Sequence, residues 1–176
     1  ASLAANYYGQ PSHELQVIGL TGTNGKTTTS YLLRSILQAT GMRCGLLGTV
    51  VHSVGDRDIP ASRTTPEAVD LQRLMREMVS AGCGGCVMEV SSHALALKRV
   101  DSVRFAAGAF TNLTRDHLDF HGDMEHYFAA KRRLFELLPS SAPAVINVDD
   151  PKGPSLVGIA ERTITYGVTQ PADISP

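Results

Sequence analysis

The glycine-rich stretch TGTNGKTT, residues 21–28, is the segment of the sequence best suited to hold a phosphate group. Glycines let backbone N–H groups turn toward an anion, and the positive end of the helix predicted next faces the same point. Lys26 would neutralise the terminal phosphates of a nucleotide, and the Thr27 hydroxyl would bind Mg²⁺. The strict phosphate-loop signature has a glycine where this chain has Leu20, so the stretch is a variant of that motif. The alternative is a glycine-rich turn with a chance Gly-Lys-Thr.

Acidic and imidazole side chains follow two later apolar runs. Glu89 ends one run, at the place where a phosphate-loop enzyme keeps its metal-binding carboxylate; a carboxylate that caps the next turn is the alternative. DHLDFH, residues 116–121, is rich in potential ligands but could equally be a solvated loop. Its histidines, His117 and His121, would need a third nitrogen or sulfur ligand to bind Zn²⁺, and none follows at metal spacing. A role for His117 at a second Mg²⁺ stays open.

Lys131 lies in the apolar stripe of a predicted helix. An unpaired ammonium group is costly to bury, so the pKa of Lys131 should fall unless a counter-charge lies nearby. One interpretation is that the side chain extends along its apolar stem until the charge reaches water. The other is a neutral amine that reacts with CO₂ to form a carbamate, an anion placed to meet a metal or another cation.

The elements that must position these residues are short apolar runs that alternate with amphipathic segments. This pattern predicts a mostly parallel sheet flanked by helices, an α/β fold. Ligands of such sheets bind beyond the carboxyl ends of the strands, which would bring the polar residues to one edge. The runs are Leu15–Leu20, Cys44–Val51, Gly85–Val90, Phe105–Phe110, Ala144–Val148 and, more weakly, Thr163–Tyr166.

Three helices are predicted between the runs. The first spans about Thr27–Thr40 and stops at Gly41. The second begins at Thr65-Pro66-Glu67, which offers a hydroxyl N-cap, a proline at the first helical position and an acidic first turn, and it ends at Gly82. The third spans about Asp123–Leu138.

Composition indicates one globular domain. The chain has 176 residues, of which 43% are hydrophobic, and its net charge of −1 argues against a protein whose main task is binding nucleic acid or anionic lipid. No apolar run approaches the ~18–20 residues that span a bilayer. Three cysteines are too few for a disulfide framework and favour a reducing, cytoplasmic compartment. Residues 1–14 and the last ten residues are expected to be loop-like connections to neighbouring domains.

Together these motifs resemble the central ATP-binding domain of the Mur ligases, which build the stem peptide of peptidoglycan. TGTNGKTT is shared with folylpolyglutamate synthetases. Three further segments resemble the MurE type, the UDP-N-acetylmuramoyl-L-alanyl-D-glutamate:amino-acid ligases: SRTTPEAVDLQ at 62–72, MEVSSHALALKRV at 88–100 and FTNLTRDHLDFHGDMEHYFAAKRRLF at 110–135. The resemblance implies a P-loop NTPase-like domain at 15–176, truncated at its C-terminal end. Residues 1–14 would lead from a UDP-binding domain, and an amino-acid-binding domain would follow.

The resemblance also implies residue roles. ATP would be bound by Gly22, Thr23, Asn24, Gly25, Lys26, Thr27 and Thr28, with Asn147 at the adenine. One Mg²⁺ would be held by Thr27 and Glu89, and a second by His117 and a carbamate on Lys131. The UDP-MurNAc-dipeptide would contact Thr64, Thr65, Ser91 and Arg99. The residues implied in catalysis are Lys26, Glu89, His117 and Lys131.

The implied reaction adds diaminopimelate or lysine to the dipeptide through an acyl phosphate. We expect a cytoplasmic monomer that binds neither nucleic acid nor membrane. A folylpolyglutamate-type ligase is one alternative, although the TTPE and DHLDFHG segments speak against it. A nucleotide-dependent switch without ligase chemistry is another, and the lack of an Asn-Lys-x-Asp motif weakens a GTPase version of it.

Overall fold

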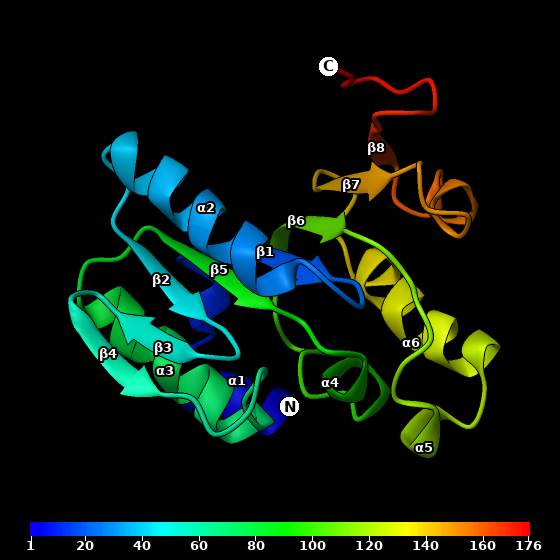
Figure 1. The fold of residues 1–176 in the computed structure, drawn as a ribbon. Coiled ribbons are helices and arrows are strands. Elements are labelled where there is room, and N and C mark those ends of the chain that lie inside the picture. Colours follow the sequence, from blue (N-terminus) through cyan, green and yellow to red (C-terminus); the bar gives the residue numbers. More distant parts are fainter.

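The computed structural model describes all 176 residues and contains one eight-stranded sheet, with the order β4-β3-β2-β5-β1-β6-β7-β8 (Figure 1). Six strands run parallel, and β3 and β4 extend one edge as an antiparallel hairpin. The predicted mostly parallel α/β sheet is confirmed. The strands are β1 Gln16–Thr21, β2 Cys44–Leu47, β3 Val51–Val54, β4 Arg57–Pro60, β5 Gly85–Glu89, β6 Phe105–Phe110, β7 Pro143–Asn147 and β8 Arg162–Tyr166.

Strand β1 lies near the middle of the sheet and is hydrogen-bonded on both sides. It pairs with β5 in a register that sets Leu20 opposite Glu89, and with β6 in a register that sets Thr21 opposite Phe110. Because parallel strands end at the same edge, the residues that follow β1, β5 and β6 meet there. This edge carries the candidate site.

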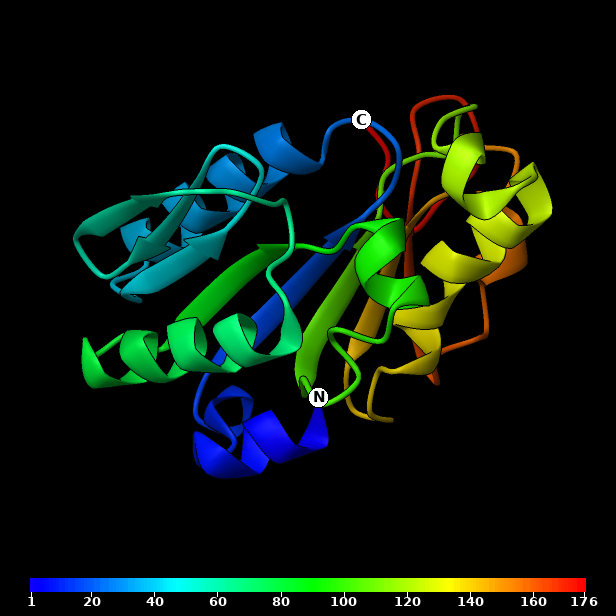
Figure 2. The same ribbon diagram turned by 90° about the horizontal axis from the view of Figure 1, so that it is seen from below.

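Helices cover the two faces of the sheet unequally. Helix α2 lies alone on one face, while α3, α4 and α6 lie on the other, with α1 next to α3 (Figures 1 and 2). The helices are α1 Ser2–Tyr7, α2 Lys26–Ala39, α3 Ala68–Ser80, α4 Ser92–Ala96, α5 Leu118–His121 and α6 Met124–Glu136, with short 3-10 turns at Pro11–His13 and Gly153–Leu156.

The hydrophobic core follows the same asymmetry. A cluster of 25 buried residues, among them Leu71, Met75 and Phe135, fills the face beneath α3, α4 and α6. The cluster on the α2 face has four buried residues and is completed by Leu33 and Leu37 of α2. Cys83 and Cys86 are buried free thiols, in agreement with a structural role for both.

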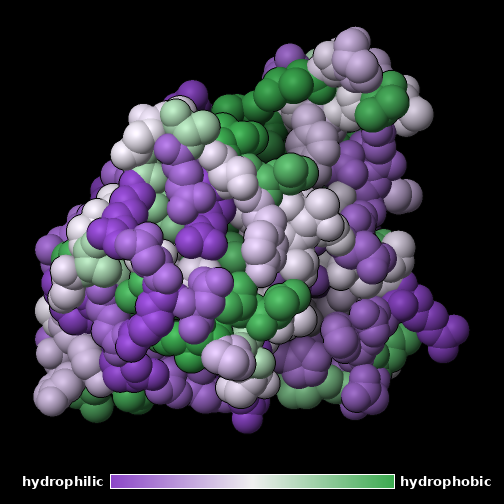
Figure 3. Space-filling view, turned by 60° about the vertical axis from the view of Figure 1, so that its left-hand side comes forward, coloured by the Kyte–Doolittle hydropathy of each residue, from purple (hydrophilic) through white to green (hydrophobic).

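The α2 face leaves apolar surface open. A groove of about 360 Å³ runs between α2 and strands β1, β6 and β7, and it is lined by hydrophobic side chains such as Leu32 and Val145. Figure 3 shows hydrophobic side chains gathered toward the top of that view and hydrophilic ones over its forward left part. None of the helices has the length and apolar character required to cross a bilayer.

Three local predictions are wrong. The run Cys44–Val51 is not one strand: β2 ends at Leu47, a turn follows, and Val51 begins the hairpin. Helix α3 begins at Ala68, with Glu67 rather than Thr65 at the N-cap position, because the Thr65 hydroxyl is held by the Glu89 carbonyl and the Ser91 N–H. Residues 1–14 are not loop-like, since they form α1 and the 3-10 turn at Pro11–His13.

The segment before β1 is fastened to α3. The guanidinium of Arg76 donates to the backbone oxygens of Tyr8 and Gly9 and pairs with Glu14 at 2.7 Å. Ala5 of α1 is buried. These contacts hold residues 1–14 against the sheet as an ordered part of the domain.

Candidate functional site

The phosphate loop forms a tight turn between β1 and α2. Gly22 has φ +150° and Gly25 has φ +84°, conformations that favour glycine. A Cβ at Gly22 would lie 1.9 Å from Thr111 Oγ1, so this position has no room for a side chain. The N-terminus of the 14-residue helix α2 faces the loop, as expected for an anion-binding turn.

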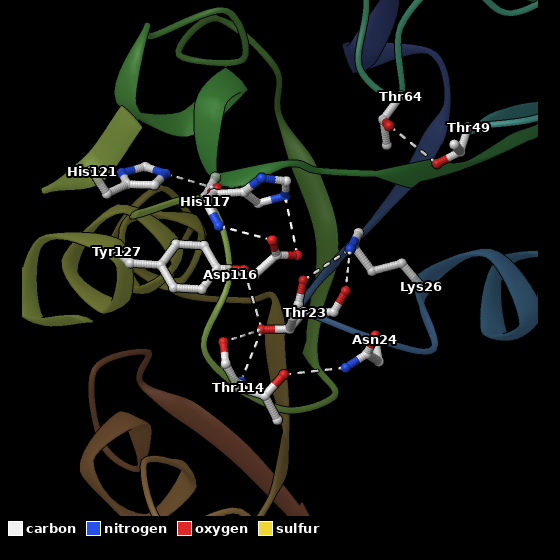
Figure 4. A network of polar contacts seen from close by, with 12 residues as sticks. Thr23, Asn24, Lys26, Thr49, Thr64, Thr114, Asp116, His117, His121 and Tyr127 are labelled. Carbon is white, nitrogen blue, oxygen red and sulfur yellow. Dashed lines mark hydrogen bonds and ion pairs between the residues drawn. The ribbon is translucent and has the colours of Figure 1, made fainter. Parts of the chain in front are cut away.

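Loop residues are also held from the side by the segment after β6. The backbone N–H of Asn24 donates to Asn112 Oδ1 at 3.0 Å, and its side-chain amide donates to Thr114 Oγ1 at 3.2 Å (Figure 4). The Thr23 hydroxyl accepts from the Thr114 N–H at 3.0 Å. The loop is therefore pre-shaped by contacts far apart in sequence. Thr28 lies on the exposed side of the first turn of α2.

Lys26 curls back over the loop that carries it. Its Nζ donates to the carbonyl oxygens of Gly22 and Thr23, both at 2.9 Å (Figure 4). Burial lowers the pKa of Lys26, while the charges of Glu89 and Asp116 act in the opposite direction. The amine is thus placed at the mouth of the phosphate loop.

Glu89 is fully buried and its carboxylate accepts three hydrogen bonds. Its Oε2 accepts from the hydroxyls of Thr27 and Thr49, each at 3.0 Å. Its Oε1 accepts from the Thr49 N–H at 3.0 Å. The structure therefore brings Thr27 and Glu89 together, as the sequence led us to expect.

Lys131 is buried with 1% of its surface exposed, so the interpretation that its charge reaches water is wrong. Its Nζ donates to the Gly22 carbonyl oxygen at 2.7 Å and lies 4.4 Å from the centre of the Tyr127 ring. Desolvation, together with the positive charge of Lys26, lowers the pKa of Lys131 to about 7. A substantial neutral fraction of this amine therefore exists near neutral pH, as carbamate formation requires.

His117 lies on the segment between β6 and α5 and makes its ring contacts with Asp116, His93 and Tyr127. It has a left-handed backbone, φ 51°, and its ring lies 3.5 Å from the Asp116 carboxylate (Figure 4). Its ring centre is 5.0 Å from that of His93 and 6.1 Å from that of Tyr127. No group of three or more His, Cys, Asp or Glu side chains could hold a metal by itself, so the zinc interpretation has no support in the geometry.

Residues expected at the muramoyl-dipeptide differ in how they are presented. Thr64 is partly exposed, and its hydroxyl lies 3.1 Å from that of Thr49. Thr65 is buried; its hydroxyl donates to the Glu89 carbonyl at 2.8 Å and accepts from the Ser91 N–H at 3.0 Å. The Ser91 hydroxyl caps α4 by accepting from the N–H of Ala94.

Arg99 and Asn147 fasten neighbouring elements. Arg99 pairs with Glu67 at 2.8 Å and contacts the Thr65 carbonyl at 3.4 Å. The Asn147 amide donates to the Thr111 carbonyl at 2.7 Å, which ties the end of β7 to the end of β6. Both residues lie at the same edge of the sheet as the phosphate loop.

Sequence reasoning missed two residues of the site. Thr49 lies inside the apolar run Cys44–Val51 and belongs to no motif, and only its contacts with Glu89 reveal it. Tyr127 lies within the predicted helix Asp123–Leu138, whose pattern indicates no role for it in the site, yet its hydroxyl lies 3.1 Å from Thr23 Oγ1 and its ring faces Lys131. A buried tyrosine needs a partner for its hydroxyl, and that requirement was the available signal.

Comparison with known proteins decides the family. The family model described as Mur ligase middle domain matches residues 20–175. The chain belongs to the Mur ligase family.

Curated Mur ligases give the finer likeness. A UDP-N-acetylmuramoyl-L-alanyl-D-glutamate–2,6-diaminopimelate ligase of Geobacter metallireducens is 53% identical over 173 residues, covering 94% of this chain and 34% of that protein. The ligase of the same name in Chlamydia trachomatis serovar D is 49% identical, covering 98% of this chain and 36% of that protein. The chain thus spans about a third of the length of these relatives.

Solved structures agree on the Mur ligase fold. A diaminopimelate ligase of the same name has a TM-score of 0.79 at 33% identity, covering 92% of this chain and 34% of that one. Escherichia coli FolC, solved in complex with DHPP and ADP, has a TM-score of 0.67 at 24% identity, covering 95% of this chain and 46% of that one. The likeness to FolC supports the shared fold only.

Proposed function

We propose that this chain is the ATP-binding part of a ligase that joins meso-diaminopimelate to UDP-MurNAc-L-Ala-D-Glu. The observation that carries the proposal is the Thr27–Glu89 contact of 3.0 Å at the mouth of the phosphate loop. The names of relatives at 49% and 53% identity support the choice of diaminopimelate over lysine. Because the chain spans a third of those relatives, the activity belongs to a longer protein.

The proposed reaction transfers the terminal phosphoryl group of ATP to the D-Glu carboxylate. The acyl phosphate is then attacked by the amine of the incoming amino acid, and phosphate leaves from a tetrahedral intermediate. The phosphoryl group and the D-Glu carboxylate are both anionic and must approach one another. Cationic groups at the loop offset this repulsion, so they make the largest contribution to catalysis. Lys26 would exchange its contacts with the Gly22 and Thr23 carbonyls for phosphate oxygens.

The residues at the loop fit a bound Mg²⁺. This ion prefers oxygen ligands and takes only one or two carboxylates besides water and phosphate. The Thr27 hydroxyl and the Glu89 carboxylate are oxygen donors within 3.0 Å of each other. When bound there, the ion would offset the negative charge of the phosphate groups.

A second Mg²⁺ is proposed at His117 and a carbamate on Lys131. The lowered pKa of Lys131, about 7, and its burial support carbamate formation. The carbamate would replace a buried cation with an anion beside Lys26, which relieves the repulsion between the two amines. Both residues lie near the Tyr127 ring, His117 with its ring centre at 6.1 Å and Lys131 with its amine at 4.4 Å, and His117 would complete the ligand set through its imidazole.

The remaining assignments follow from position around the loop. Thr64, Ser91 and Arg99 would contact the muramoyl-dipeptide, with Thr65 supporting them from below, and Asn147 would contact adenine. Residues 1–14 would lead in from a UDP-binding domain, and residues 15–176 would be the central domain, followed by an amino-acid-binding domain. We propose a cytoplasmic location, because the nucleotide and precursor substrates are cytoplasmic, and we further propose that the protein is a monomer.

The test uses the full-length protein with ATP, Mg²⁺ and UDP-MurNAc-L-Ala-D-Glu. Each reaction receives meso-diaminopimelate, L-lysine or neither, and release of ADP is followed together with the product mass. We expect amide product with meso-diaminopimelate. Absence of product with both amino acids would overturn the ligase proposal, and turnover with a folate acceptor instead would favour the folylpolyglutamate alternative.

A further inference from the structure

Thr49 connects the buried carboxylate to the partly exposed Thr64. It lies in the turn after β2, and both its N–H and its hydroxyl donate to Glu89 at 3.0 Å. On its other side, the same hydroxyl lies 3.1 Å from Thr64 Oγ1, and the two hydroxyls face each other across the turn (Figure 4). Three residues thus form one continuous chain of polar contacts.

The number of hydroxyl protons determines which group donates in each hydrogen bond between Glu89, Thr49 and Thr64. A threonine hydroxyl has one proton and two lone pairs, and an ionised carboxylate only accepts. The Thr49 proton is directed to Glu89 Oε2, so Thr49 can meet Thr64 only by accepting. The Thr64 proton is therefore committed to Thr49. What Thr64 still offers outward is its lone pairs.

Thr65 cannot share this task. It is buried with 1% of its surface exposed, its proton is directed to the Glu89 carbonyl, and it already accepts from the Ser91 N–H. Of the two neighbouring threonines, only Thr64 presents an unused acceptor at the surface. At Thr64 the site therefore offers a hydrogen-bond acceptor and not a donor, which defines the polarity of this position.

We propose that Thr49 is a positioning residue that holds Thr64 as a hydrogen-bond acceptor, so that Thr64 selects an amide N–H of the muramoyl-dipeptide. This inference rests on the proposed function, because it takes that dipeptide as the ligand. A substrate group with only lone pairs at this point would face a Thr64 that has no proton to give. Thr49 would act through Thr64, which it contacts together with Glu89.

The experiment measures the dissociation constant of UDP-MurNAc-L-Ala-D-Glu by calorimetry on the full-length protein without ATP. Thr49→Val and Thr64→Val should each weaken binding by about 3- to 10-fold, the effect of one lost neutral hydrogen bond. The double variant should be no weaker than Thr64→Val, because both changes remove the same contact. Thr49→Ser should restore wild-type affinity, and Thr40→Val, at the far end of α2, serves as the matched control.

Polarity is tested with dipeptide analogues in which each amide N–H is methylated in turn. For each protein, the loss of affinity is the ratio between the dissociation constants of the methylated analogue and the parent ligand. For one of the analogues, this loss should be about 3- to 10-fold larger in the wild type than in Thr64→Val. Additive effects of the two valine changes, or equal losses in both proteins for every analogue, would overturn the inference. Ligation activity in the wild type with either of these results would leave the proposed function standing, whereas a wild type that neither binds nor ligates the dipeptide would refute both.

Discussion

Lys26 and Lys131 donate to the same acceptor, the carbonyl oxygen of Gly22, at 2.9 and 2.7 Å. The two residues come from opposite ends of the domain sequence, and their amines converge at the turn of the phosphate loop. Two ammonium groups that share one oxygen repel each other, and this repulsion adds to desolvation in lowering the pKa of Lys131 to about 7. The next two predictions depend on this arrangement.

Lys131 should take up CO₂ near neutral pH. Carbon dioxide adds to the neutral amine and a proton is released, so the carbamate fraction should rise as pH rises through about 7. The measurement is ¹³C NMR of the protein in labelled bicarbonate, which should show one carbamate signal. Lys131→Met should abolish that signal, and Lys98→Met, which changes an exposed lysine, should leave it unchanged. A signal that survives Lys131→Met would contradict the assignment.

Lys131→Met should stabilise the fold in CO₂-free buffer. The pKa of Lys131 in the folded state, about 7, lies below the ordinary lysine pKa of 10.5, so between these values the unfolded chain binds more protons at this residue. Wild-type stability should therefore rise with pH across this window, and the variant should lack that contribution. At pH ~7 we expect the variant to be more stable by ~1–4 kcal/mol, from denaturant unfolding. If the stability difference between the variant and the wild type grew toward high pH, the predicted direction of the pH dependence would be refuted.

Glu89→Gln should weaken nucleotide binding only where Mg²⁺ contributes. Removing the charge leaves an oxygen for the donors from Thr27 and Thr49 but lowers the affinity for a divalent cation. We expect ADP to bind at least about 10-fold more weakly in Mg²⁺ and equally well in EDTA, by calorimetry. Glu125→Gln, at an exposed glutamate paired with Lys152, is the control. Equal Mg²⁺ dependence in both variants would argue against a metal at Glu89.

Gly22→Ala should damage the loop more than Gly25→Ala. A Cβ at Gly22 meets Thr111 Oγ1 at 1.9 Å, whereas a Cβ at Gly25 meets nothing within 4 Å. Crowding of this kind typically costs ~1–3 kcal/mol on top of the backbone conformation. Gly25→Ala should lose only the ~1–2 kcal/mol of a left-handed residue. Thermal unfolding and ADP affinity of both variants provide the comparison, and equal losses would show that the contact with Thr111 relaxes.

Much of the site was predictable because it depends on strand ends. An acid at the end of β5 and a glycine-rich turn after β1 must meet if the two strands are parallel neighbours, and Thr27 and Glu89 do meet. The anomaly of Lys131 was visible because a charged residue in an apolar stripe violates the periodicity that predicts the helix. Each of these signals lies within a short stretch of sequence and is compatible with one placement of the residue in the fold.

Other features depended on contacts that no local pattern encodes. Thr65-Pro66 has the form of a helix start, but its hydroxyl is held by the Glu89 carbonyl and the Ser91 N–H, so the helix begins later. The role of Thr49 exists only because its turn folds over the buried carboxylate. The antiparallel hairpin was hidden because Leu47 and Val51, both apolar, flank the turn that separates β2 from β3.

The pairing of Leu20 with Glu89 has an evolutionary consequence. Side chains alternate between the two faces of a strand, so losing or gaining one residue within β5 would send the carboxylate to the opposite side of the sheet. Replacing one buried apolar side chain of β5 by another of similar volume would leave the carboxylate in place, whereas a change in the number of residues would not. We therefore expect selection to act on the length of this five-residue strand as well as on the acid at its end.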